Sequence, residues 1–175
     1  MSGTKNYRGV SIQAIRGNIA DQPDMTAIVN AANASLSPGG GVAGAIHRAA
    51  GPGLEEECRP LAPIRPGEAV ITSAHDLPNK YVIHCLGPVY GRDKPEDRLL
   101  AECYRNALLL ADKEGIDSIA FPAISAGAFG YPLKKALQVG LQTIRESIPS
   151  FQNVKKIRMV LFSESDLEAF IQLLD

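Results

Sequence analysis

Two glycine-rich segments, far apart in the chain, each follow an apolar run that ends in a small polar residue. The first, residues 30–47, contains three consecutive glycines from Gly39, and the second, residues 121–132, contains Gly127. Each is predicted to lead from a strand into a helix. Such a turn directs backbone N–H groups and a helix N-terminus toward one point, which suits a phosphate. Two such turns that face each other would hold a diphosphate.

The composition indicates a globular protein without a strong charge of either sign. The chain has 175 residues, of which 45% are hydrophobic and 21% charged, and its net charge is −1. This length predicts one domain, residues 1–175, that buries roughly two thirds of its unfolded surface. No basic field attracts nucleic acid or anionic lipid, so neither is an expected partner. A bound anion must therefore be held mainly by backbone dipoles.

The cysteines and histidines do not form a recognisable metal or redox motif. They are Cys58, Cys85 and Cys103, and His47, His75 and His84. Three cysteines cannot all pair and none are spaced Cys-x-x-Cys, which favours reduced, mostly buried thiols in a cytoplasmic protein. The histidines do not stand at zinc-ligand spacings from them, so no metal site is expected. Neither a signal peptide nor an apolar stretch of membrane-spanning length is present.

Short runs rich in β-branched residues alternate with helical patterns. The predicted strands are residues 10–15, 27–30, 69–72, 81–86, 118–122 and 157–162. The predicted helices are residues 42–50, 96–113, 133–147 and 165–174. The polar residues 1–7 are expected to be frayed and disordered. The alternation predicts an α/β fold, a three-layer α/β/α sandwich around a mixed, mostly parallel sheet of about six strands. Only residues 75–80 separate two of these strands, which predicts a hairpin.

The pattern Gly39-x-Gly41-x-x-Gly44 also satisfies the dinucleotide fingerprint of Rossmann domains. In that fold the first glycine follows its strand almost immediately, whereas here residues 31–38 lie between. No second strand ends in an acidic residue at the usual distance. A Rossmann-like dinucleotide-binding protein therefore stays an alternative, ranked third after the two functions given at the end of this section. A Walker-type loop is excluded because neither turn is followed by Lys-Ser or Lys-Thr.

Four separated motifs together resemble a macrodomain over residues 10–174. They are Gly-Asn-Ile at 17–19, continued by Ala-Ile-Val-Asn-Ala-Ala-Asn at 27–33; the glycine-rich run at 39–52; Tyr-Val-Ile-His-Cys-Leu-Gly-Pro at 81–88; and the run at 121–132. The resemblance implies binding of ADP-ribose and its conjugates. Many bacterial and viral members hydrolyse ADP-ribosyl esters, O-acetyl-ADP-ribose or ADP-ribose-1″-phosphate, so the expected partner is ADP-ribose or an ADP-ribosylated protein or metabolite. The resemblance implies no cofactor.

The resemblance also places the site residues. The implied ligand-binding residues are Asn18, Ile19, Asn33, Gly39, Gly40, Gly41, Val42, Ile124, Ser125, Ala126, Gly127, Ala128, Phe129 and Phe162. Asn33, Gly41 and Phe129 form the implied catalytic group: Asn33 grips the distal ribose and Phe129 packs against it. Asn33 is expected to donate to one hydroxyl and accept from another. Phe162 either covers the adenine or is a core residue.

Two positions depart from the family pattern. Asn18 stands where the family usually has an aspartate that accepts from the adenine amino group. An uncharged acceptor weakens that bond by about 1 kcal/mol, and an amide can also flip and donate, which predicts relaxed base selectivity. Ala43 stands where MacroD-type hydrolases carry an aspartate, and the Val-Ala pair resembles viral and some archaeal members. This change removes the obvious general base.

The remaining candidates for catalysis are weak. His47 lies one helical turn inside the predicted helix and is expected to hydrogen-bond within the structure. His84 lies in a buried strand pattern and is expected to be structural. Ser125 has no histidine partner at a recognisable spacing, so a serine nucleophile is poorly supported.

The sequence therefore predicts a monomeric macrodomain that hydrolyses ADP-ribosyl esters. Without a side-chain base, the substrate's own diphosphate would anchor the attacking water, and positioning and amide dipoles would provide most of the acceleration. The alternative is a reader that binds ADP-ribose without cleaving it.

Overall fold

The computed structural model describes residues 2–175. The strands are β1 Ser2–Tyr7, β2 Val10–Arg16, β3 Ala27–Ala31, β4 Ala69–Ser73, β5 Tyr81–Cys85, β6 Ser118–Phe121 and β7 Lys156–Leu161. The helices are α1 Gly41–Ala50, α2 Pro52–Cys58, α3 Glu96–Lys113, α4 Leu133–Ser147 and α5 Glu164–Leu174, with 3-10 turns η1 Arg59–Leu61 and η2 Ile148–Ser150. All six predicted strands and all four predicted helices are present within a residue or two of their predicted ends.

The strands form one mixed sheet in the order β1-β2-β7-β6-β3-β5-β4. The five central strands are parallel, and β1 and β4 are antiparallel edges. The predicted hairpin is confirmed as β4 and β5. This order differs from the doubly wound order of a Rossmann domain, so that alternative is not supported.

The prediction of a frayed N-terminus is wrong for residues 2–7. They form β1, a seventh strand that pairs with β2 from Ser2 opposite Ile15 to Tyr7 opposite Val10. Strand pairing uses main-chain hydrogen bonds and needs no apolar side chains. Helix α5 also covers this strand closely, because a Cβ on Gly3 would lie 2.9 Å from Ile171. Met1 lies outside the described residues.

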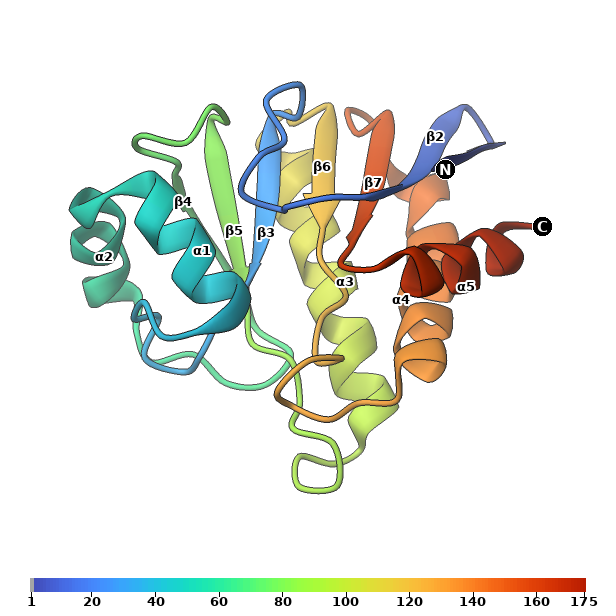
Figure 1. Ribbon diagram of the computed structural model, residues 1–175. Helices are drawn as coiled ribbons and strands as arrows, with labels where there is room; N and C mark the ends of the chain where they lie inside the picture. Colours follow the sequence, from blue (N-terminus) through green and yellow to red (C-terminus); the bar gives the residue numbers. More distant parts are fainter. Residues whose placement is uncertain (1) are drawn as a thin grey trace.

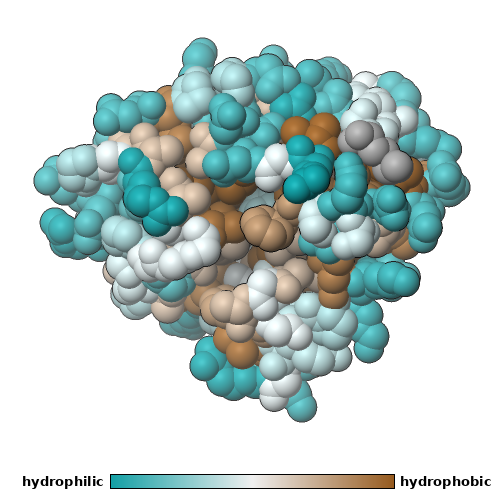
Figure 2. Space-filling view, viewed as in Figure 1, coloured by the Kyte–Doolittle hydropathy of each residue, from teal (hydrophilic) through white to brown (hydrophobic). Residues whose placement is uncertain are grey.

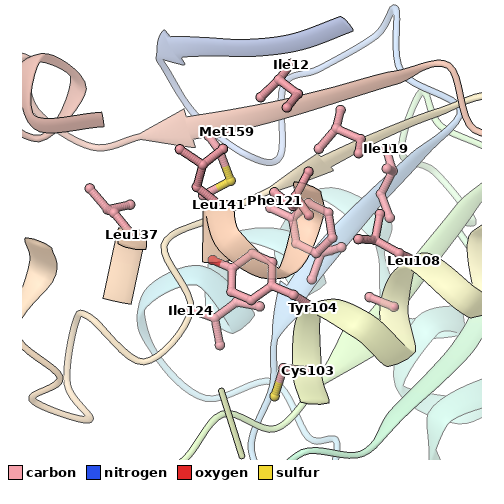
Figure 3. Close-up of a cluster of buried hydrophobic side chains, with 14 of the residues drawn as sticks. Ile12, Cys103, Tyr104, Leu108, Ile119, Phe121, Ile124, Leu137, Leu141 and Met159 are labelled. Carbon is pink, nitrogen blue, oxygen red and sulfur yellow. The ribbon is translucent and has the colours of Figure 1, made fainter. Parts of the chain in front are cut away.

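Helices cover both faces of the sheet (Figure 1). One buried cluster joins the sheet to α3, α4 and α5, and a second joins the opposite face to α1 and α2. Figure 3 shows the first cluster, in which the rings of Tyr104 and Phe121 stack with their centroids 4.9 Å apart. Ile124, just beyond β6, belongs to the same cluster. The core therefore holds the start of the second glycine-rich segment. The three-layer prediction is confirmed.

A buried arginine holds the loop between β2 and β3. Arg158 on β7 is 8% exposed, and its guanidinium donates to both carboxylate oxygens of Asp24 at 2.8 and 2.6 Å. It also donates to the side chains of Gln13 and Gln22. Gln22 in turn donates to the carbonyl of Asn18 at 3.0 Å. The loop that carries Asn18 is thus tied to the central sheet.

Acid should remove the stabilisation that Asp24 provides. The hydrogen bonds from Arg158 hold the pKa of Asp24 at about 2, below its ordinary value of 3.8. A carboxyl group with a lowered pKa stabilises the fold above its unfolded pKa, and this contribution is lost as pH falls from about 4 to about 2. Over that window, the free energy of unfolding should fall more steeply for the wild type than for Asp24→Asn, as measured by urea titration.

Asp21→Asn, in the same loop but outside this ion pair, is the matched control and should keep the wild-type slope. Parallel slopes for the wild type and Asp24→Asn would contradict the prediction.

Candidate functional site

The two glycine-rich segments lie at the same edge of the sheet. The first loop (residues 32–42) follows β3 and the second loop (residues 122–132) follows β6, and these strands are parallel neighbours. Ligands of α/β sheets bind at the carboxyl ends of the strands, where both loops stand (Figure 1). Val42 and Phe129 pack against one buried cluster. The loops are therefore brought together across the strand ends.

Helix α1 begins at Gly41 without a side chain that caps it. Its N-cap, Gly40, makes no side-chain hydrogen bond, and the first turn holds no acidic residue. The first backbone N–H groups of a helix have no acceptor within the helix. Those of Gly41, Val42 and Ala43 are therefore free to donate to a bound group, and the partial positive charge at this end favours an anion.

Glycines let the first loop approach the helix closely. Gly39 and Gly41 have φ of +87° and +56°, a left-handed conformation that favours glycine. A Cβ on Gly44 would lie 2.6 Å from the carbonyl oxygen of Gly39, so α1 packs against the loop only because no side chain intervenes. At Gly40 and Gly41, by contrast, an added Cβ would meet no side chain or backbone atom of a more distant residue within 4 Å. The loop's backbone is open to a ligand there.

The Asn33 side chain is engaged by its own loop. Its Oδ1 accepts from the Ser37 N–H at 3.0 Å and from the hydroxyls of Ser35 and Ser37, and its Nδ2 donates to the Ser37 carbonyl at 3.0 Å. A carbonyl oxygen has two lone pairs, so Oδ1 has no capacity left for a ligand. In this conformation Asn33 can therefore donate to a ligand but not accept from one, and the prediction that it does both with a ribose stays a prediction. One N–H of Nδ2 remains available.

Three turn hydrogen bonds close the second loop. They run from Ala126 N to Ala123 O at 3.2 Å, from Gly130 N to Gly127 O at 3.0 Å and from Tyr131 N to Ser125 O at 3.0 Å. The N–H groups of Ser125, Gly127, Ala128 and Phe129 have no partner among residues 2–175. Unpaired N–H groups close together in a turn form an anion-binding concavity. The second loop, like the start of α1, therefore offers unpaired backbone N–H groups that suit an anion.

Ser125 holds the second loop in a constrained conformation. Its φ is +66°, its side chain is 6% exposed, and its Oγ has no hydrogen-bond partner among the described residues. A Cβ on Gly87, just beyond β5, would collide with this oxygen. The Ser125 hydroxyl therefore packs against Gly87, and no histidine hydrogen-bonds to it among the described residues.

A third segment, residues 88–95 after β5, also contacts the second loop. The Tyr90 N–H donates to the Phe129 carbonyl at 2.9 Å, and the Tyr90 ring lies 4.8 Å from that of Tyr131. The Tyr131 hydroxyl donates to Asp97 at the start of α3. Sequence reasoning missed Tyr90, although Gly-Pro at a strand end, two residues before it, marks a loop at the same edge.

At the far end of this edge, an exposed asparagine and an exposed phenylalanine follow neighbouring strands. The Gly17 N–H donates to the Leu161 carbonyl at 3.0 Å, so β2 and β7 stay paired up to the residues that precede Asn18 and Phe162. Phe162 is 88% exposed. The core interpretation of Phe162 is therefore wrong, because β7 ends at Leu161 and the ring turns outward.

Two predicted ligand residues have side chains that lie in the core. Ile19 and Ile124 are 6% and 1% exposed and belong to the two buried clusters. Ile19 nevertheless has a backbone N–H without a partner in the described part of the chain. At position 19 the group available to a ligand is therefore a main-chain donor, whereas the Ile124 backbone hydrogen-bonds to the buried Tyr104.

Burial favours the neutral form of both buried histidines, His47 and His84. Burial lowers the pKa of His84 to about 3, and its ring contacts Asn30 at 3.1 Å and Thr72 at 3.0 Å. His84 is structural, as predicted. Burial also lowers the pKa of His47, but neither ring nitrogen has a partner among residues 2–175, so the predicted hydrogen bond of His47 is wrong.

The two loops present no carboxylate, imidazole, amine or guanidinium side chain. Ala43 is 5% exposed, and apart from the Tyr131 hydroxyl, which donates to Asp97, the hydrogen bonds of both loops involve only backbone, asparagine and serine groups. In the described residues, no three or more His, Cys, Asp or Glu side chains are placed to hold a metal ion. Nor is any helix there long and apolar enough to cross a membrane. All three cysteines are free and buried, as predicted.

The hydropathy of the surface agrees with a candidate site at this edge of the sheet. Figure 2 shows apolar and weakly polar surface in a hollow at the centre of the face drawn in Figure 1, between α1 and α5, with a hydrophilic rim. Two other grooves, of about 620 and 460 Å³, lie along α4 and between β4 and α3. No residue of either loop lines them. The convergent donors, rather than groove size, therefore identify the candidate site.

Comparison with known proteins gives the family. The model of the Macro domain matches residues 29–140. The chain belongs to the Macro domain family. A Macro domain-containing protein of Chlorobaculum tepidum is 47% identical over 162 residues, 92% of this chain and 94% of the relative. A Salmonella typhimurium protein named O-acetyl-ADP-ribose deacetylase is 45% identical over 168 residues, 93% of each.

Solved macrodomains share the whole architecture. The Oceanobacillus iheyensis macrodomain with ADP matches with a TM-score of 0.94 and 39% identity, covering 99% of this chain and 95% of that one. The Trypanosoma brucei macrodomain in complex with ADP-ribose matches with a TM-score of 0.87 and 37% identity, covering 94% and 69%. The macrodomain resemblance in the sequence is therefore confirmed.

A carboxylate in the second loop should weaken anion binding. No atom lies within 4 Å of a Cβ on Gly127, so Gly127→Glu should fold. Repulsion of about 1–4 kcal/mol between the new charge and a diphosphate should weaken ADP binding about tenfold or more. Isothermal titration calorimetry with ADP measures this.

Gly127→Ala is the matched control, because it adds bulk without charge and should keep binding within a few-fold. ADP binding that survives unchanged in Gly127→Glu would show that the diphosphate lies elsewhere.

Proposed function

We propose that this protein binds ADP-ribose and hydrolyses ADP-ribosyl esters. The observation that supports this most directly is the convergence of unpaired main-chain N–H groups from the start of α1 and from the second loop. These donors suit a diphosphate in a chain whose net charge is −1. The 45% identical relatives named O-acetyl-ADP-ribose deacetylase support the hydrolytic reading.

The strand order gives the proposed ligand a direction. A diphosphate between the ends of β3 and β6 has β7 and β2 on one side and β5 on the other. The exposed ring of Phe162 lies toward β2 and suits the adenine. Asn33 and Phe129 lie near the diphosphate and suit the distal ribose, with the free N–H of Asn33 donating to a ribose hydroxyl. Tyr90, which contacts Phe129, extends this end.

In the proposed mechanism, the substrate supplies the proton acceptor. A water held by a phosphate oxygen attacks the ester carbonyl carbon of O-acetyl-ADP-ribose. The water proton passes to the phosphate, the bond from the acyl carbon to the ribose oxygen breaks, and that oxygen takes up the proton. For a protein ester, attack at the anomeric carbon instead releases the side-chain carboxylate. Positioning by Asn33 and Phe129 and by the amide dipoles supplies the acceleration.

A reader that binds ADP-ribose without cleaving it is the second candidate. The observation that favours it is Ala43, which is buried at the first turn of α1 and offers no base. Substrate-assisted attack needs no base there, so the hydrolase remains the better-supported proposal. Turnover of an ADP-ribosyl ester separates the two.

Replacing Asn33 should lower turnover more than binding. Asn33→Ala removes the remaining N–H donor, so the ester loses its orientation and kcat should fall about tenfold or more, with a smaller change in KM. The substrates are O-acetyl-ADP-ribose and protein mono-ADP-ribosylated on acidic side chains, and the readout is released ADP-ribose.

Ser37→Ala is the control for loop structure. It removes one hydroxyl contact to Asn33 Oδ1 but leaves the amide and its free N–H in place, so its kcat should stay within a few-fold of wild type. Equal losses in both variants would assign Asn33 a purely structural role. Full turnover by Asn33→Ala would refute the mechanism, and tight ADP-ribose binding with no turnover by the wild type would favour the reader.

A further inference from the structure

The loop after β2 presents hydrogen-bond donors next to an aromatic ring. Asn18 is exposed, and Phe162, which follows the neighbouring strand β7, is 88% exposed. An uncovered ring next to a polar edge is the arrangement that stacks and reads a flat heterocycle. Which heterocycle it suits depends on whether that edge donates or accepts.

The hydrogen bond to Ala20 fixes the orientation of the Asn18 amide. The Ala20 N–H lies 2.9 Å from Asn18 Oδ1. A backbone N–H can only donate, so the oxygen must face it, and the opposite orientation would set two donors against each other. Nδ2 is therefore the group that Asn18 turns away from its own loop. An aspartate in the same turn would offer a second acceptor there instead.

The adjoining backbone offers a second donor. The Ile19 N–H has no partner among the residues the structure describes, although the Ile19 side chain is buried. The Asn18 carbonyl is occupied, because it accepts from the Asp21 N–H and from Gln22 Nε2. The edge beside Phe162 is thus made of two donors, Asn18 Nδ2 and Ile19 N–H.

Two neighbouring donors match a purine that has two neighbouring acceptors. A 6-oxopurine offers O6 and N7 side by side, whereas adenine offers N7 next to an amino group that itself donates. Adenine therefore satisfies one of the two donors and sets its amino group against the other. We propose that this protein accepts a 6-oxopurine diphosphate ribose at least as tightly as ADP-ribose, with Asn18 as the residue that determines base specificity. This inference rests on the proposed function.

Inosine diphosphate ribose tests the inference, because its base differs from adenine only in the oxygen at position 6 and the proton that this places on N1. By calorimetry, the wild type should bind it with a Kd equal to or lower than that for ADP-ribose. Asn18→Asp restores an acceptor for the adenine amino group and should shift the ratio of the two Kd values toward ADP-ribose about tenfold or more. Phe162→Ala is the control. It should weaken the binding of both ligands by the same factor, because a stacked ring does not distinguish the two purines.

The outcomes separate this inference from the proposed function. A lower wild-type Kd for ADP-ribose than for inosine diphosphate ribose, or an unchanged ratio in Asn18→Asp, overturns the inference and leaves ADP-ribose binding intact. Failure of the wild type to bind either ligand overturns both.

Discussion

The site depends on main-chain N–H groups that the fold leaves unpaired. Those at the start of α1 lack acceptors because a helix cannot satisfy its own first turn, and those of the second loop lack them because its turns bond elsewhere. Such donors are costly unless water or a ligand reaches them. Their position is fixed from beneath, because Ile124 and Phe121 are anchored in the core with Tyr104 (Figure 3). The rigid core therefore determines where an anion can bind.

A site built from amides has a different chemistry from one built from ionisable side chains. No group in either loop titrates near neutral pH, and the two buried histidines are held neutral by desolvation. Reaction at such a site depends on how well the ligand is held and on the charge that the ligand itself brings. The absence of a carboxylate at Ala43 is compatible with the proposed mechanism, in which the diphosphate of the substrate accepts the proton.

The helices and strands that have periodic apolar patterns could be predicted from the sequence. Elements that form through main-chain hydrogen bonds, without such a pattern, were missed. β1 escaped notice because polar residues pair as well as apolar ones, while α2 was marked only by Gly51-Pro52, a common helix start. The motifs identified both loops, but not how each side chain is used. The saturation of Asn33 Oδ1, the outward turn of Phe162 and the contact from Tyr90 depend on distances that spacing does not encode.

The close approach of Gly87 to the second loop couples the ends of β5 and β6. A Cβ at position 87 would collide with the Ser125 hydroxyl and lie 2.7 Å from Cγ2 of Ile124, so a methyl group can enter only if both neighbours move or become smaller. Because residue 125 is left-handed, glycine is the replacement there that also relieves the backbone. A side chain at 87 therefore requires earlier changes at both 124 and 125, so that the order of substitutions, and not only their identity, is constrained.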